Sequence, residues 1–238
     1  MTLAHLQSAI ADLVCDEIDL RAFLEGPDSW VKGRRLGEHE AKLLREIDPS
    51  AMQAFHDIHA RDRAYFIEAV LPLTTSRLGE GWSSSYFRAH PFGDDDVQVE
   101  ADRFAHHLAQ QDDDATACLA RFEVAKFNLL DEPVFDPGDP LRIRAPRPAA
   151  LAHGIAVVEA SWHLPSLVED PHAHPIPRRG VSLLRRDADG VTSAWLEGIE
   201  ADLLAAIARK DHTGLTKLTT TPDGRRAFIQ IVGEGILQ

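Results

Sequence analysis

The sequence has little of what holds small secreted domains or structural zinc sites together. Its two cysteines, Cys15 and Cys118, lie far apart and form no Cys-x-x-Cys pair. A disulfide framework or a structural zinc site is therefore not expected. We interpret both cysteines as free, buried thiols.

Long apolar runs are also missing. A helix needs about 20 consecutive apolar residues to cross a bilayer, and the richest run, Phe66 to Leu73, is interrupted by Glu68 and Pro72. The first fourteen residues lack a basic flank and carry apolar residues at helical spacing, which predicts an amphipathic helix and not a signal peptide. We therefore expect a cytoplasmic protein that has no membrane partner.

Positive charge is scarce. The chain has 25 Lys and Arg against 38 Asp and Glu, a formal net charge of −13. An excess of this size repels a polyphosphate backbone, so a nucleic-acid partner is not expected.

Catalytic signatures are absent from the sequence as well. It contains no His-Glu-x-x-His, Gly-x-Ser-x-Gly or P-loop pattern, and its two Gly-Glu-Gly segments are too short for a dinucleotide loop. We expect neither catalytic residues nor a cofactor or metal site in this chain.

Three groups of histidines are the candidates for a metal site. His56, His59 and Asp62 have the spacing of one helical face, so a metal triad is conceivable, but the polar face of a surface helix explains them better. Adjacent histidines at 106 and 107 point apart on a helix, and those at 172 and 174 lie in a proline-rich loop. Two ligands do not complete a metal site.

The chain divides into two parts with different periodicity. Residues 1–135 predict a helical domain, in which Ser50 caps a helix and Pro72 splits a later one. Residues 136–150 are rich in proline and predict a linker, and residues 151–238 predict a second domain.

The second domain predicts strands followed by helices. Three short runs rich in β-branched and apolar residues occur at 155–162, 181–185 and 191–196, and Asp-Ala-Asp-Gly at 187–190 predicts a hairpin. Three helical segments then follow, the last opened by Thr221 and Pro222. The fold class is therefore α+β: a helical domain, then a small three-stranded sheet with helices in a winged-helix-like arrangement of the peptide-recognition type.

A pattern between residues 61 and 130 carries a resemblance. It consists of Arg63, Tyr65, Leu71-Pro72, Leu78-Gly79-Glu80, Trp82, Tyr86, His90-Pro91, Phe104, Leu108 and Leu119-Ala120-Arg121-Phe122-Glu123. This pattern resembles a bacterial family, named for a DNA-binding domain, whose members are partner proteins of multinuclear non-haem iron-dependent oxidases. Members of this kind act in methanobactin and 3-thiaglutamate biosynthesis.

The resemblance implies a specific function. The chain would be the non-catalytic partner subunit of an iron-dependent oxidase, in a heterodimer that modifies a ribosomally made precursor peptide after translation. The oxidase would hold the iron, while this chain would bind the leader peptide and present the cysteine-containing core. A second segment, residues 22–50, is similar to the small helical subunit of extradiol ring-opening dioxygenases, which is also the companion of an iron enzyme.

We expect the leader peptide to add to the edge of the sheet. The proposed edge strand contains Val191, Thr192, Ser193, Ala194 and Trp195. Phe228 and Ile231 would form a wall beside it, or would be core residues, and Arg225 and Arg226 would pair with leader carboxylates. A proline at Thr192 is expected to remove a donor from the open edge.

Docking of the oxidase is expected on the helical part. The aromatic residues Trp82, Tyr86, Phe87 and Phe92 offer material for a protein interface, although some of these rings could be core residues.

Two other functions stay open at this point. The winged-helix-like order suggests a DNA-binding transcriptional regulator, which the charge of −13 opposes. A free-standing metal-dependent enzyme would use His56, His59 and Asp62, without support from a further motif.

Overall fold

The computed structural model describes residues 3–34, 36–93, 96–111, 113–136 and 150–237. The fold is α+β, mostly helical, with one three-stranded antiparallel sheet among these residues. None of the helices that the structure describes combines the length and the apolar character needed to cross a membrane. The chain forms two compact units, Met1–Ala69 with Gly79–Glu100 (unit 1) and Val70–Leu78 with Ala101–Gln238 (unit 2).

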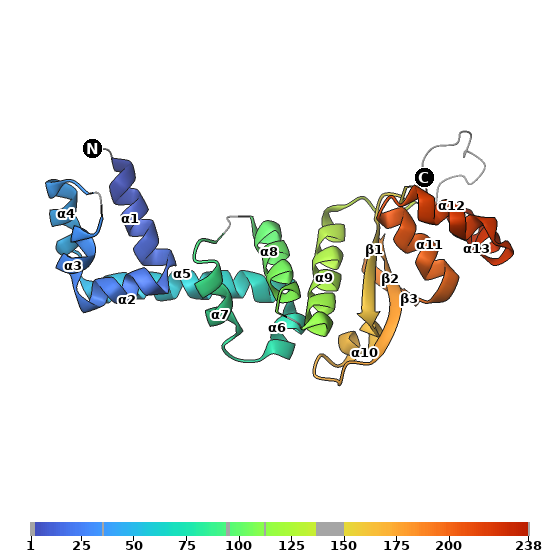
Figure 1. Cartoon of the computed structure of the whole chain (residues 1–238), viewed down its shortest axis with the longest axis horizontal. Helices are drawn as coiled ribbons and strands as arrows, with labels where there is room; N and C mark the ends of the chain where they lie inside the picture. Colours follow the sequence, from blue (N-terminus) through green and yellow to red (C-terminus); the bar gives the residue numbers. More distant parts are fainter. Residues whose placement is uncertain (1–2, 35, 94–95, 112, 137–149, 238) are drawn as a thin grey trace. The chain divides into compact units, whose positions relative to one another are not determined.

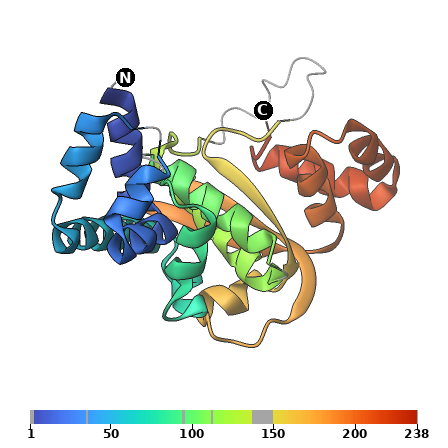
Figure 2. The ribbon, with the colours of Figure 1, turned by 60° about the vertical axis from the view of Figure 1, so that its left-hand side comes forward.

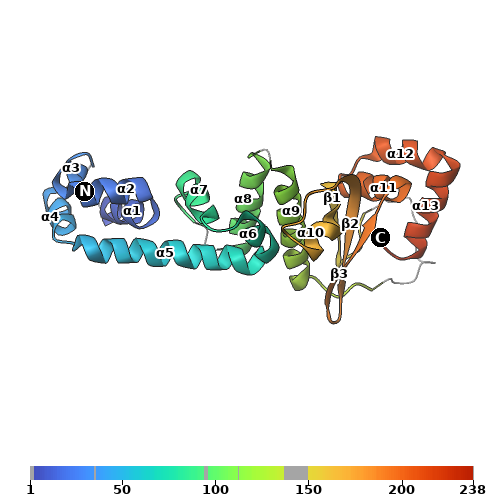
Figure 3. The ribbon, with the colours of Figure 1, turned by 90° about the horizontal axis from the view of Figure 1, so that it is seen from below.

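Unit 1 consists of helices. They are α1 (Leu3–Cys15), α2 (Glu17–Glu25), α3 (Pro27–Lys32), α4 (Glu38–Arg45), α5 (Pro49–Val70), α7 (Trp82–Ala89) and the first turn of α8 (Val97–Ala109). Leu13, Phe23 and Leu44 are fully buried in a core that α1–α4 share with Met52 of α5. The four short helices lie together at the beginning of α5 (Figures 2 and 3).

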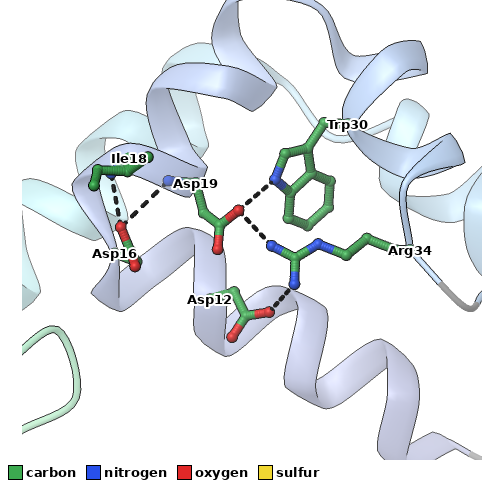
Figure 4. A network of polar contacts seen from close by, with 6 residues as sticks. All are labelled: Asp12, Asp16, Ile18, Asp19, Trp30 and Arg34. Atoms are coloured by element: carbon green, nitrogen blue, oxygen red, sulfur yellow. Dashed lines mark hydrogen bonds and ion pairs between the residues drawn. The ribbon is translucent and has the colours of Figure 1, made fainter.

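A polar network closes the turn between α3 and α4 against α1 and α2 (Figure 4). The indole Nε1 of Trp30 donates to Asp19 Oδ1 over 2.9 Å, and Arg34 donates to both Asp19 and Asp12. Burial acts to raise the pKa of Asp19, but the hydrogen bonds from Arg34 and Trp30 outweigh it and bring that pKa below its usual value. Asp16 caps α2 by accepting from the amides of Ile18 and Asp19.

A buried ion pair joins α5 to α8 within unit 1. Arg63 donates to Glu100 Oε1 over 2.6 Å and to the carbonyls of His90 and Pro91 over 3.0 Å each. Its guanidinium also lies 4.4 Å from the ring centre of Phe87. Removing one partner of such a pair would leave a buried charge uncompensated, at a cost of about 3–5 kcal/mol.

Unit 2 contains the sheet. Its elements are α6 (Pro72–Leu78), the rest of α8, α9 (Asp114–Asn128), η1 (Leu129–Asp131), β1 (Ile155–Trp162), α10 (Leu164–Glu169), β2 (Pro177–Asp187), β3 (Gly190–Leu196), α11 (Gly198–Ala208), α12 (His212–Thr220) and α13 (Pro222–Gly233). The strand order is β1-β2-β3, so β2 is central and the other two strands are edges.

Helices cover both faces of this sheet (Figures 1 and 3). Val158 and Leu184 pack with Cys118 and Phe122 of α9 and with Leu164 of α10 on one face. Val181 packs on the other face with Leu203 and Ile207 of α11 and with Ile231 of α13. The alternation of burial along the strands therefore builds two cores, and α12 and α13 pack onto α11 and onto each other.

The sequence predicted these strands well. Asp187 pairs with Gly190, so Ala188 and Asp189 form the tip of the expected hairpin, and Gly190 takes a positive φ of 149°. Residues 137–149 of the expected linker lie outside the described residues. Helices α6 and α9 belong to the same compact unit as the sheet. From the sequence they were expected in the helical domain of residues 1–135.

The network around Asp19 yields the first prediction. Asp19→Ala leaves the Trp30 indole N–H and one arm of Arg34 without their acceptor, which should destabilise unit 1 by about 1–3 kcal/mol. Folding lowers the pKa of Asp19, so the ionised side chain stabilises the folded state. This stabilisation is fully present above the pKa of Asp19 in the unfolded chain, about 3.9, and is lost as the pH falls through the lower pKa of the folded state. Hydrogen exchange of the α1–α3 amides should accelerate.

The exposed pair of Arg21 and Glu17 provides the control. Arg21→Ala should change the same amides little, because a solvent-exposed ion pair contributes about 0–1 kcal/mol. Equal acceleration in both variants would show that Asp19 has no special role.

Candidate functional site

The main chain at the edges of the sheet is the feature of unit 2 that suits a peptide ligand. The amide of Arg186 in β2 donates to the carbonyl of Gly154, just before β1, over 2.8 Å. In an antiparallel sheet the N–H and C=O of one residue point to the same side, and the side alternates along the strand. Arg186, Leu184 and Ser182 therefore face β1, while the residues between them face β3.

The register then identifies the outward-facing groups. On β1 these belong to Val157 and Glu159, and on β3 to Val191, Ser193 and Trp195. None of these five main chains forms a hydrogen bond with another residue that the structure describes. Each edge thus offers donors and acceptors to an added strand.

The predicted peptide-binding strand lies at one of these edges. Thr192, Ser193 and Ala194 are exposed, and Val191 and Trp195 are half-buried. The sequence predicted that the amide of Thr192 faces the open edge, and this prediction is wrong. Thr192 pairs with Arg185, whose main chain faces β3, so the amide of Thr192 points inward to β2. The outward donor is that of Ser193.

Helix α13 was expected to form a wall beside a peptide bound at β3, but few of its apolar side chains are open to a ligand. Ile231 is 4% exposed and belongs to the core, which was the alternative reading of the sequence, and Phe228 is half-buried against the same core. Arg225 and Arg226 are exposed, and Arg226 is 2.5 Å from Asp223 on its own helix. The structure therefore gathers the β3 residues but places Ile231 out of reach of a ligand.

The ring of Trp195 is fixed by polar contacts on one side of β3. Its Nε1 donates to Glu197 Oε1 over 2.5 Å, and the same carboxylate pairs with Arg178 over 2.6 Å. The hydrogen bond from Trp195 and the charge of Arg178 lower the pKa of Glu197. Gly180 lies beneath the ring, where a Cβ atom would meet the main-chain oxygen of Leu196 at 2.7 Å.

The histidines at 56 and 59 line a separate pocket in unit 1, with a volume of about 340 Å³. His59 Nε2 is 3.5 Å from the thiol of Cys15, and His56 Nδ1 is 2.9 Å from the carbonyl of Val14. Burial raises the pKa of Cys15, and burial together with Arg63 lowers the pKa of His59. A neutral thiol is a poor nucleophile.

The conceivable metal triad does not form a cluster. Asp62 is exposed, and within the described ranges no three side chains of His, Cys, Asp or Glu lie close enough to hold a metal ion. The other histidines have neighbours of their own: His106 and His107 contact Gln110 and Gln111, and His172 contacts Ser76. His106 and His172 are exposed, as expected of surface residues, whereas His107 is 9% exposed and buried.

The aromatic residues predicted to dock the oxidase differ in exposure. Tyr86 is fully buried, Trp82 and Phe87 are half-buried, and Phe92 is 50% exposed. Other apolar side chains of unit 1 are more open, in particular Phe55 and Tyr65, which are 63% and 67% exposed. Tyr86 is thus a core residue, as the alternative reading allowed.

Three residues that line the edge of the sheet were not predicted as site residues from the sequence. Arg121 and Asn128 of α9 line the space beside β1, as does Glu159 of β1 itself. Arg121 belongs to the family-like pattern, which was the available signal, but nothing in the sequence shows that α9 lies along β1.

Comparison with known proteins does not add to this geometry. Neither a scan against models of protein families nor a search of curated proteins finds a match to the chain.

The alternation along β3 can be tested with two prolines. Thr192→Pro removes the amide that faces Arg185, so it should destabilise the protein by about 1–3 kcal/mol. Ser193→Pro removes an outward amide and should leave the melting temperature nearly unchanged. Thermal unfolding of both variants checks this, and an equal loss in both would mean that the assignment of inward and outward residues is wrong.

Proposed function

We propose that the chain is a non-catalytic partner subunit that captures an extended precursor peptide and presents it to an iron-dependent peptide-modifying oxidase. The observation that carries the proposal is a small antiparallel sheet with unpaired main-chain groups along its edges. Strand addition to such an edge gives affinity through the main chain and specificity through alternate side chains. The family-like pattern at residues 61–130 supplies the link to the oxidase.

The order of elements in unit 2 supports a winged-helix-like interpretation of the C-terminal part. A three-stranded sheet is followed directly by α11, α12 and α13, which pack together. In this proposal the sheet serves as a peptide platform and not as a wing for DNA. The net charge of −13 supports the peptide over a nucleic acid.

Capture of the leader would act through effective concentration. Holding the leader on this chain makes the encounter of the core peptide with the iron site intramolecular. The oxidase supplies the iron and the chemistry, and the residues of this chain bind and orient the peptide.

Docking of the oxidase is proposed for unit 1, through an exposed stripe on α5. Phe55, Ile58, Tyr65 and Phe66 are 46–67% exposed and have the i, i+3, i+10, i+11 spacing of one helical face. Exposed Asp62 lies on the same face between Ile58 and Tyr65, so the stripe consists of two apolar patches with a charged residue between them. Exposed apolar patches rimmed by polar residues are typical of a protein interface. The charge of −13 opposes a second copy of the chain as the occupant and favours a partner with a basic rim.

Reconstitution tests the proposed function. A tagged oxidase from a neighbouring gene should oxidise its precursor peptide rapidly only when this chain is present, as measured by mass spectrometry of the peptide. The chain alone should consume no oxygen and hold no stoichiometric iron. One equivalent of iron, lost in the His56→Ala, His59→Ala double variant, would instead establish a metalloenzyme.

The stripe on α5 gives a separate prediction. Tyr65→Ala with Phe66→Ala should weaken binding of the oxidase at least about tenfold, or 1.4 kcal/mol, because interface aromatic residues carry much of the binding energy. Both side chains are largely exposed, so the melting temperature should change little. Phe92→Ala is the control, because Phe92 belongs to the aromatic cluster that the sequence analysis named for docking. If Phe92→Ala weakens binding of the oxidase and the α5 double variant does not, the oxidase docks on that cluster and not on α5.

A further inference from the structure

The outer edge of β1 lies in a cleft, and this distinguishes it from the edge of β3. A pocket of about 350 Å³ lies between β1 and α11, where Ala201, Asp202 and Ala205 line it. A second pocket of about 640 Å³ lies where β1 meets α9 and the end of α8. Arg121 and Glu159 line both pockets, so the two spaces adjoin each other along the strand.

The main chain of β1 has unsatisfied groups in this cleft. Val157 and Glu159 direct their N–H and C=O away from β2, and no residue that the structure describes pairs with them. Both residues also line the larger pocket. Another extended chain can satisfy both donors and acceptors of this kind at once.

The side chains around the cleft define the chemistry of its occupant. Arg121 bonds to Ala117 and Cys118 of its own helix and has no carboxylate within ion-pair distance among the described residues. By contrast, Arg209 is paired with Glu159 over 2.9 Å. Arg179, which also lines the smaller pocket, is paired with Asp202 over 3.8 Å. A carboxylate on the ligand would therefore find its partner in Arg121.

The far wall of the larger pocket adds two further features. Ala105, Val124 and Ala125 give it a small apolar surface, which admits a side chain of the ligand. The Oδ1 atom of Asn128 is buried and accepts no hydrogen bond from any described residue. It can accept one from a ligand amide, because a buried acceptor gains from a donor.

We propose that the cleft along β1, and not the edge of β3, binds the extended peptide, and that the bound segment carries an acidic side chain directed at Arg121. This inference rests on the proposed function. The segment adds antiparallel or parallel to β1 as a fourth strand. Its side chains alternate between the pocket on the α11 side and the pocket on the α9 side.

The test uses the full chain and peptides selected from a phage-displayed random library. Enriched peptides are synthesised and titrated, and exchange of individual amides is followed by NMR. Bound peptide should slow exchange at Val157 and Glu159 at least about tenfold, while Ser193 and Trp195 stay unchanged. The enriched sequences should contain Asp or Glu.

Substitutions complete the experiment. Arg121→Ala should weaken binding about tenfold, whereas Lys126→Ala, at an exposed position of the same helix outside both pockets, should not. Val157→Pro should abolish peptide binding, and Val157→Ala should retain it. If the proline variant does not fold, the amide exchange of the unaltered chain decides whether the peptide binds at β1.

The outcomes separate this inference from the function on which it rests. Protection of Ser193 and Trp195 with loss of binding in Ser193→Pro would overturn the β1 cleft and leave peptide capture intact. Failure to enrich any peptide over an unrelated control protein would overturn peptide capture itself.

Discussion

The buried carboxylate of Glu123 is the interaction on which the arrangement of unit 2 depends. It is 4% exposed and accepts hydrogen bonds from the amides of Leu73 and Thr74 over 2.8 Å each and from the Thr74 hydroxyl over 2.7 Å. Burial raises the pKa of Glu123. A side chain of α9 thus satisfies the free amides at the start of α6. From α6, Arg77 donates to the carbonyls of Pro171 and Ala173 and so holds the loop before β2.

Local signals in the sequence explain why much of the fold could be predicted. The β-branched runs gave the three strands, and Pro72 separates α5 from α6 as expected. The predicted cap of α5 was wrong by two residues. Asp48 and not Ser50 caps this helix, because the carboxylate of Asp48 accepts a hydrogen bond from the Ser50 amide over 2.9 Å. The six residues of α10 were missed, because a helix of one and a half turns leaves no periodicity to read.

The candidate site was harder to predict, for two physical reasons. First, whether Thr192 or Ser193 faces outward depends on the pairing register, and a shift of one residue exchanges the two sides. Second, the β1 cleft is assembled from α8, α9, β1 and α11, whose lining residues extend from Asp102 to Arg209. Long-range contacts of this kind leave no mark on local composition. Tyr86 shows the same limit, since its aromatic character fits a core and an interface equally well.

The two-residue repeat of the β1 edge would constrain the evolution of any peptide that binds there. Outward groups recur only at alternate positions, Val157 and Glu159, so an added strand keeps its hydrogen bonds when it slides by two residues. A single inserted or deleted residue would turn every following side chain to the opposite pocket. Sequences recognised by such an edge should therefore diverge through substitutions and paired insertions, and single-residue gaps should be rare within the bound segment.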